Sequence, residues 1–154
     1  MRKWHLSQYD PLSLTLAADQ RFCHPDRNND QVWELSLGGG DPSTLSLQTT
    51  YGLRARSMRI FPRFIEAGIP ASDPLHFFEQ PRLLKFFPNY AEVAFSPFKE
   101  LTAVIEYWVL DSQLVAGRLH ITNQGESTRT FTLEIASVLV PMGHGQATAP
   151  KQRG

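Results

Sequence analysis

Regular alternation of apolar and polar residues constrains this chain more than any other feature. The segment GRLHITNQGESTRTFTLEI alternates, passes through a polar turn and alternates again. The same period of two recurs in PLSLTLAA, QVWELSL and TLSLQTTYG, whereas no stretch predicts a long helix. A half-buried strand has to keep this alternation, because a one-residue slip would turn its core face to water. Short strands separated by turns every ~8–12 residues predict an all-β antiparallel sandwich with at most one short helix.

Turn residues and prolines divide the chain into these strands. GGGDPS, residues 38–43, predicts the turn of a β-hairpin. In SMRIFPRF, Pro62 lacks an amide donor, which predicts an edge strand or a bulge. Asp73 followed by Pro74 predicts the cap and first residue of one or two helical turns. RLLKFFPNYAEVAFSPF, with its two internal prolines, predicts short extended pieces.

The C-terminal half holds the most apolar strands. LTAVIEYWVLDS is β-branched and aromatic on both faces, which predicts a buried strand. In LVAGRLHIT and TRTFTLEIASVLVP, the residues expected to face the core are Val115, Leu119, Ile121, Phe131, Leu133, Ile135 and Leu139. We expect a single sandwich domain over residues 1–143, with residues 144–154 as a flexible tail or a linker to a downstream domain.

Composition excludes several classes of function. Hydrophobic residues make up 42% of the 154 residues, which is enough for a real core. Lys+Arg and Asp+Glu are 15 each, so the chain lacks the net positive charge typical of partners of nucleic acid or anionic membranes. The lone cysteine, Cys23, cannot form an internal disulfide. We read no signal peptide in the polar N-terminus and expect a cytoplasmic protein.

No catalytic or metal-binding motif is visible in the sequence. The five histidines lack the spacing of a zinc site, and no G-x-S-x-G elbow is present. GGGDP lacks the lysine of a phosphate-binding loop, so we expect no cofactor and no metal. Two carboxylates would suffice for sugar hydrolysis, but spacing pairs none of the candidates. These candidates are Asp30, Glu34, Glu106, Asp111 and Glu134.

The stretch YGLRARSMRIFPRF is the most unusual in composition. Four arginines, Arg54, Arg56, Arg59 and Arg63, are interleaved with Tyr51, Phe61 and Phe64. Arginine and aromatic residues together suit sugar or protein contacts. The plainer interpretation is a solvated sheet face whose arginines pair with acids such as Glu34 and Glu106. Trp33 and Trp108 are further candidates for sugar contact, although their apolar neighbours favour a place in the core.

Three segments resemble a known domain. They are WHLSQYDPLSLTLAAD, NDQVWELSLGGGDPSTLSLQTTYGLRARSMRIFPRF and EYWVLDSQLVAGRLHITNQGESTRTFTLEI. Together they resemble the N-terminal super-sandwich of large bacterial glycoside hydrolase-like proteins with an (α/α)6 catalytic barrel. These are the glucosidase, glycogen-debranching and cyclic-glucan families. The shared strand pattern, R-L-x-I-x-N-x-G followed by R-x-F-x-L-E-I, falls on Arg118 to Asn123 and on Arg129 to Ile135.

The resemblance implies a non-catalytic accessory domain. In such enzymes the catalytic carboxylates lie in the helical barrel, so no catalytic residue is carried over to this chain. The sandwich packs on the barrel and helps to shape the rim of its active site. The implied partners are a downstream catalytic domain and an oligo- or polysaccharide. The alternatives are a free-standing carbohydrate-binding module, an interaction or self-association domain, and a small enzyme in its own right.

Overall fold

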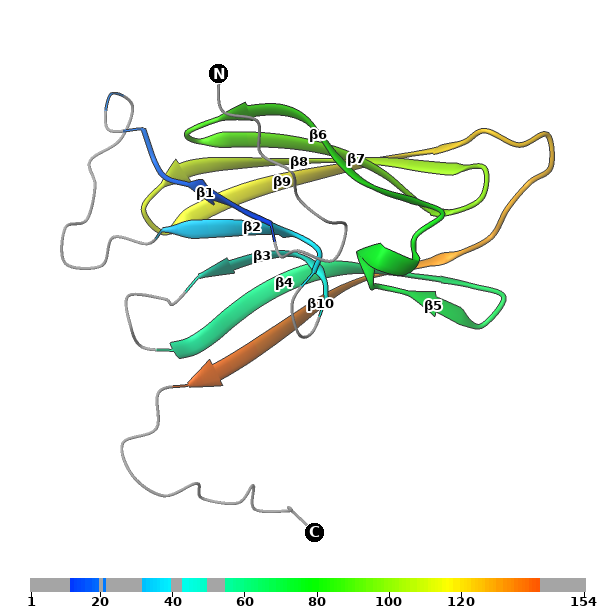
Figure 1. Cartoon of the computed structure of the whole chain (residues 1–154), viewed down its shortest axis with the longest axis horizontal. Helices are drawn as coiled ribbons and strands as arrows, with labels where there is room; N and C mark the ends of the chain where they lie inside the picture. The colour runs from blue at the N-terminus through cyan, green and yellow to red at the C-terminus, as the bar shows by residue number, and fades with distance from the viewer. Residues whose placement is uncertain (1–11, 20, 22–31, 40–42, 50–54, 142–154) are drawn as a thin grey trace, which may run out of the picture.

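The computed structural model shows two antiparallel β-sheets packed face to face, which confirms the predicted all-β sandwich (Figure 1). The structure describes residues 12–19, 21, 32–39, 43–49 and 55–141. The predicted tail, residues 144–154, lies outside the described residues.

Sheet A follows the order β1-β2-β3-β4-β10, with β5 paired to part of β4. Its strands are β1 (Ser13–Leu16), β2 (Trp33–Leu37), β3 (Leu45–Thr49), β4 (Ala55–Glu66), β5 (Ile69–Ala71) and β10 (Thr132–Pro141). The predicted hairpin around residues 38–43 joins β2 to β3, which pair in an antiparallel manner.

Sheet B follows the order β6-β7-β8-β9. Its strands are β6 (Glu79–Phe87), β7 (Tyr90–Phe98), β8 (Leu101–Asp111) and β9 (Leu114–Asn123). The expectation of short pieces between residues 82 and 98 is wrong, because β6 and β7 have nine residues each. Pro88 lies in the turn between them, and Pro97 lies in an irregularity of the β7–β8 register between Phe95 and Phe98. Each proline therefore stands where the ladder needs no donor.

One 3₁₀ turn, η1 (Pro74–His76), is the helix that the sequence predicts. The Asp73 carboxylate accepts a hydrogen bond from the amide of Leu75 at 2.9 Å, and Pro74 follows the cap directly. This turn carries the chain from sheet A to sheet B (Figure 1).

Alternating residues of both sheets meet in one core. Phe64 of β4 packs edge-on against Phe95 of β7, with ring centroids 5.8 Å apart. Phe77, which follows η1, stacks on the other side of Phe95 at 5.3 Å. A backbone hydrogen bond of 2.8 Å from Ala17 to the carbonyl of Pro88 also links the two sheets.

Pro62 lies in a central strand, so the prediction of an edge strand is wrong for β4 as a whole. β4 pairs with β10 along its length on one side. On the other side it pairs with β3 up to Ile60 and with β5 from Phe64 onward. Pro62 lies in the gap between these two ladders, where a missing N–H costs little.

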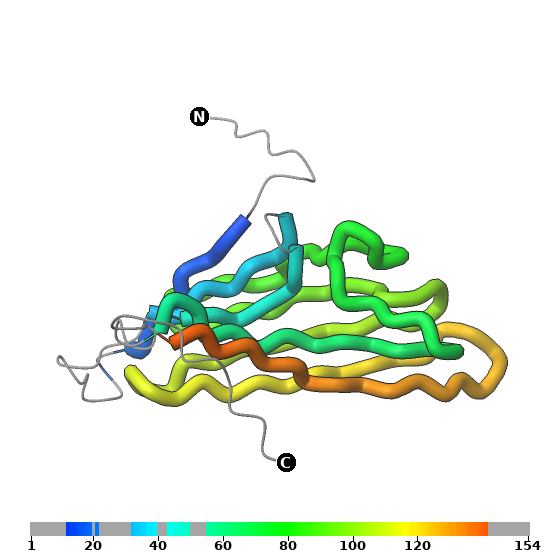
Figure 2. Tube along the Cα trace, turned by 90° about the horizontal axis from the view of Figure 1, so that it is seen from below, coloured from blue at the N-terminus to red at the C-terminus, as the bar shows by residue number. Residues whose placement is uncertain are grey.

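β9 and β10 end their sheets on the same side, along the lower margin of Figure 2, and the sandwich is open there. Leu133, Ile135 and Leu139 point to the inner face of sheet A, as predicted, because they pair with the inward residues of β4. They are nevertheless 37%, 65% and 61% exposed. Their expected burial is wrong because the sandwich is open on this side, where a cavity lies between the sheets.

Candidate functional site

The arginine-rich stretch lies along β4 and does not form one surface. Arg54 lies outside the described residues. Arg59 and Arg63 point away from sheet B, and the Arg59 guanidinium lies 6.0 Å from the centroid of the Phe61 ring. Phe64 points inward and is fully buried. Phe61 and Phe64 therefore lie on opposite faces of sheet A, whereas Tyr51 lies outside the described residues.

Arg56 borders a hollow of about 290 Å³ on sheet A. Glu34 and Gln48 line the same hollow, and the Gln48 amide donates a hydrogen bond to Glu34 at 3.0 Å. The Nε atom of Arg59, which is opposite Gln48 in the register, is buried and has no hydrogen-bond partner among the described residues. This hollow is polar but holds no concentrated charge.

Among the described residues, none of these arginines forms the ion pair with Glu34 or Glu106 that the sequence had suggested. Arg63 lies 3.4 Å from Glu134 of β10, and both side chains are about half exposed. Glu106 instead binds Arg118 of β9, at 2.5 Å. An exposed ion pair such as that of Arg63 stabilises a fold only slightly, so this face has the properties of a solvated sheet surface.

The two candidate tryptophans have different environments. Trp33 is only 6% exposed and lies in the core, as its apolar neighbours indicate. Trp108 is on the outer face of β8 and is partly exposed, so its predicted place in the core is wrong. Its neighbours Tyr107 and Val109 occupy the inner face, because adjacent strand residues point in opposite directions.

Trp108 belongs to a set of residues that we call the sheet B platform. The platform consists of an aromatic row, Phe87, Tyr90 and Trp108, and a charged row, Lys85, Glu92, Glu106 and Arg118. Each row runs across the strands because its members are cross-strand partners in the register. The signs along the charged row are plus, minus, minus and plus.

The aromatic row is continuous. The ring centroids of Phe87 and Tyr90 are 6.1 Å apart, and those of Tyr90 and Trp108 are 5.3 Å apart. The Arg118 guanidinium lies 5.6 Å from the Trp108 ring and extends the row onto β9. Phe87 is 56% exposed, so one end of the row is open to solvent.

Hydrogen bonds hold the charged row in place. Lys85 donates to Glu92 at 2.7 Å, and Arg118 donates to Glu106 at 2.5 Å. The Tyr90 hydroxyl lies 2.9 Å from a carboxylate oxygen of each glutamate. It therefore bridges two carboxylates that face each other across β7 and β8. Two like charges become tolerable in this position because each has its own cation.

These contacts also fix the ionisation of the platform. Hydrogen bonds from Lys85 and Tyr90 hold the pKa of Glu92 below its usual value. The hydrogen bond from Arg118 does the same for the pKa of Glu106. Burial and the two glutamates raise the pKa of Tyr90, which remains a neutral phenol. Both carboxylates are thus ionised near neutral pH.

The platform is suited to binding rather than to acid–base catalysis. A hydrolytic pair needs one carboxyl group kept protonated as the general acid, which requires a raised pKa. Glu92 and Glu106 both have lowered pKa values. Three other predicted carboxylates have partners elsewhere: Glu34 accepts a hydrogen bond from Gln48, Glu134 binds Arg63, and Asp111 accepts a hydrogen bond from the amide of Gln113. Asp30 lies outside the described residues.

Sequence reasoning identified only Trp108 of the aromatic row as a candidate for sugar contact. Phe87 and Tyr90 flank the two-residue turn Pro88–Asn89, and this turn sets the register that aligns the row. That turn can be recognised in the sequence as KFFPNYAEV. Glu106, two residues before Trp108 on the same strand, is a charged residue that indicates the outer face of β8. The pairing of β7 with β8, which completes both rows, is not visible there.

Among the described residues, no group of three or more His, Cys, Asp or Glu side chains could hold a metal ion. Within the same part of the chain, no helix is long and apolar enough to cross a membrane. Comparisons with protein families, with curated proteins and with solved structures find no match.

Proposed function

We propose that this chain is a non-catalytic accessory domain of a cytoplasmic, carbohydrate-active protein and contacts glycan through the sheet B platform. The observation that carries the proposal is the pairing of an aromatic row with an ionised charged row on one sheet face. The resemblance to the super-sandwich of glycoside hydrolase-like proteins supports the same function.

The chemistry of the two rows matches that of a sugar ring. A pyranose has apolar C–H faces, which can pack against the flat rings of Tyr90 and Trp108. Its hydroxyl groups lie at the ring edge, where they can donate to Glu92 and Glu106. Hydrogen bonds to ionised acceptors are stronger than neutral ones, so the charged row adds orientation to the stacking.

The test is retardation of the full chain in native gels that contain glycogen or a soluble β-glucan. Trp108→Ala should weaken binding by at least about tenfold, the usual cost of truncating a central aromatic anchor. Phe78→Ala is the matched control, because Phe78 is 60% exposed and lies outside the platform. Trp33→Ala is unsuitable, since that residue is part of the core.

Two outcomes would count against glycan binding. One is a wild-type chain that neither glycan retards. The other is an equal loss of retardation in the Trp108 and Phe78 variants, with circular dichroism showing both variants folded. Partial loss in Glu92→Gln would support the role given to the charged row, because glutamine keeps the shape and removes the charge.

As the resemblance implies, the partner of the domain would be a downstream catalytic barrel of the same polypeptide. The exposed apolar residues Leu83 and Phe86 on the inner face of β6 offer a surface for that contact. An antibody against this chain should then detect a band several times larger than 17.4 kDa in a lysate of the source cells. A band of 17.4 kDa would leave the free-standing module and self-association as the alternatives.

A further inference from the structure

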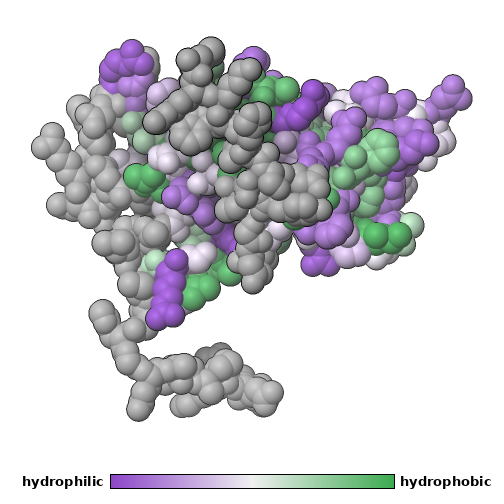
Figure 3. Space-filling model, in the orientation of Figure 1, coloured by the Kyte–Doolittle hydropathy of each residue, from purple (hydrophilic) through white to green (hydrophobic). Residues whose placement is uncertain are grey.

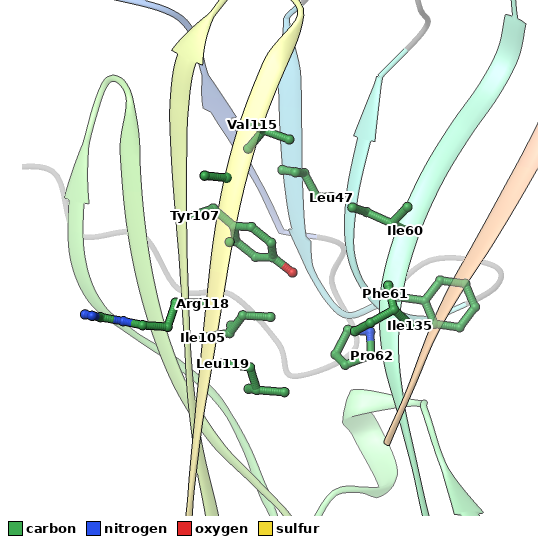
Figure 4. Close-up of a pocket in the computed structure, with 12 residues that line it drawn as sticks. Leu47, Ile60, Phe61, Pro62, Ile105, Tyr107, Val115, Arg118, Leu119 and Ile135 are labelled. Atoms are coloured by element: carbon green, nitrogen blue, oxygen red, sulfur yellow. The ribbon is translucent and has the colours of Figure 1, made fainter. Parts of the chain in front are cut away.

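A cavity of about 220 Å³ lies between the two sheets at the open β9–β10 side (Figure 4). Its walls are almost entirely apolar. Sheet A contributes Ile60, Pro62 and Ile135, and sheet B contributes Ile105, Tyr107 and Leu119. On the surface shown in Figure 3, hydrophobic residues lie in patches separated by hydrophilic ones. In the cavity, by contrast, most of the lining side chains are apolar.

Two of the lining residues, Tyr107 and Arg118, carry polar side-chain atoms, and the Arg118 side chain extends away from the other labelled residues (Figure 4). The Tyr107 side chain extends from β8 into the cavity, and its hydroxyl points toward Pro62 and Ile135 of the opposite sheet (Figure 4). Tyr107 is only 5% exposed as a whole residue, and no hydrogen bond joins its hydroxyl to the described part of the chain. Burial raises the pKa of Tyr107, so the phenol stays neutral and can both donate and accept. Because this hydroxyl faces the cavity and has no protein partner among the described residues, it is available to hydrogen-bond a ligand there.

The cavity can be reached from solvent. Gly117 of β9 is opposite Tyr107 in the register and has no side chain to close the mouth. A Cβ atom at Gly117 would lie 3.4 Å from two atoms of the Tyr107 ring, so the glycine also leaves room for that ring. On the other side of the mouth, Ile135 is 65% exposed.

We propose that this cavity binds a compact aromatic or alicyclic molecule that carries one hydroxyl or carbonyl group. An apolar cavity of about 150 Å³ in another protein holds benzene, so the larger volume here accommodates a substituted ring. The single hydroxyl of Tyr107 selects one polar substituent. A sugar, whose many hydroxyl groups would remain unpaired here, is excluded by the same chemistry. Of the platform residues, only Arg118 also lines the cavity, so the two sites lie on opposite faces of sheet B.

The test uses p-cresol and p-xylene, which have nearly the same shape and differ by one hydroxyl group. Binding to the full chain would be followed by shifts of backbone amide resonances around Gly117. Tyr107→Phe should weaken p-cresol binding by about 2- to 12-fold, the effect of one lost hydrogen bond. The affinity for p-xylene should stay unchanged, because Phe keeps the ring that forms the wall.

A second variant keeps the proposal testable if Tyr107→Phe does not fold. Ile135→Trp enlarges an exposed side chain at the mouth and should abolish binding of both probes. Leu139→Trp is its control, since Leu139 lies on the same face of β10 but does not line the cavity. The proposal is overturned if wild-type protein binds neither probe, if Tyr107→Phe weakens both equally, or if Ile135→Trp leaves binding intact.

Discussion

Replacing Phe64 by Ala should lower the free energy of unfolding by about 3–5 kcal/mol. Phe64 is 0% exposed and touches both Phe95 of sheet B and Phe131, with ring centroids 5.8 and 6.4 Å apart. Alanine would delete the ring and leave a void between two sheets that other side chains hold apart. A domain has only about 5–15 kcal/mol of stability, so this loss would bring the variant close to unfolding.

Phe61 provides a matched control on the same strand, because it lies on the outer face of β4. Phe61→Ala loses a partly exposed ring and its contact with Arg59, at a cost of about 1 kcal/mol or less. Urea titrations followed by the fluorescence of buried Trp33 and by circular dichroism would measure both variants. Equal losses of stability would refute the assignment of these two residues to opposite faces of sheet A.

Two further predictions concern charge. Glu92 and Glu106 have pKa values below the usual 4.5 in the folded state, so their contribution to stability is complete above that value. This contribution is lost as the pH falls through the lowered folded pKa values, so thermal midpoints should drop as the pH falls below 4.5. Glu106→Gln should flatten this decline, and an unchanged pH profile would contradict the role of the pair. Arg129→Ala should lower the thermal midpoint more than Arg63→Ala. The Arg129–Glu66 pair is only 17% and 22% exposed, whereas the Arg63–Glu134 pair is 45% and 46% exposed. Arg129 also donates to the Lys99 carbonyl and so ties the chain before β10 to the β7–β8 turn. A smaller effect of Arg129→Ala would refute this ranking.

Strands with alternating apolar and polar residues, and the face that each of their residues takes, were predictable from the sequence because alternation is a local property. Leu133, Ile135 and Leu139 do share the inner face of β10, and Asp73 does cap the one short helical turn. Each of these features depends on neighbours within a few residues. Propensity and spacing therefore carry the information needed to predict them.

Burial was less predictable, since it depends on what the opposite sheet covers. β10 lies at the open side of the sandwich, so Ile135 and Leu139 face inward and remain exposed. The residue pattern of β10 gives no information on how closely the opposite sheet approaches it. The cavity at this side arises in the same way and was not predicted from the sequence.

The misplaced Trp108 shows a different limit. β8 is apolar on both faces, so composition alone does not decide which of Tyr107 and Trp108 points inward. Glu106 on the face of Trp108 is the local clue, and the alignment with Tyr90 completes the platform only through the β7–β8 register. Such alignment depends on how strands far apart in the sequence pair, so the local residue pattern does not determine it.

The β8–β9 pair forms a wall between the two proposed sites. Tyr107 and Gly117 are cross-strand partners on its cavity side, while Glu106 and Arg118 are partners on its platform side. Neighbouring residues of one strand thus serve different surfaces, because successive side chains point to opposite faces. Changes at Tyr107 and at Trp108 should therefore separate cleanly, each affecting one class of ligand. A loss of both activities on either change would mean that the wall itself had shifted, and only the control variants could then assign a ligand to a face.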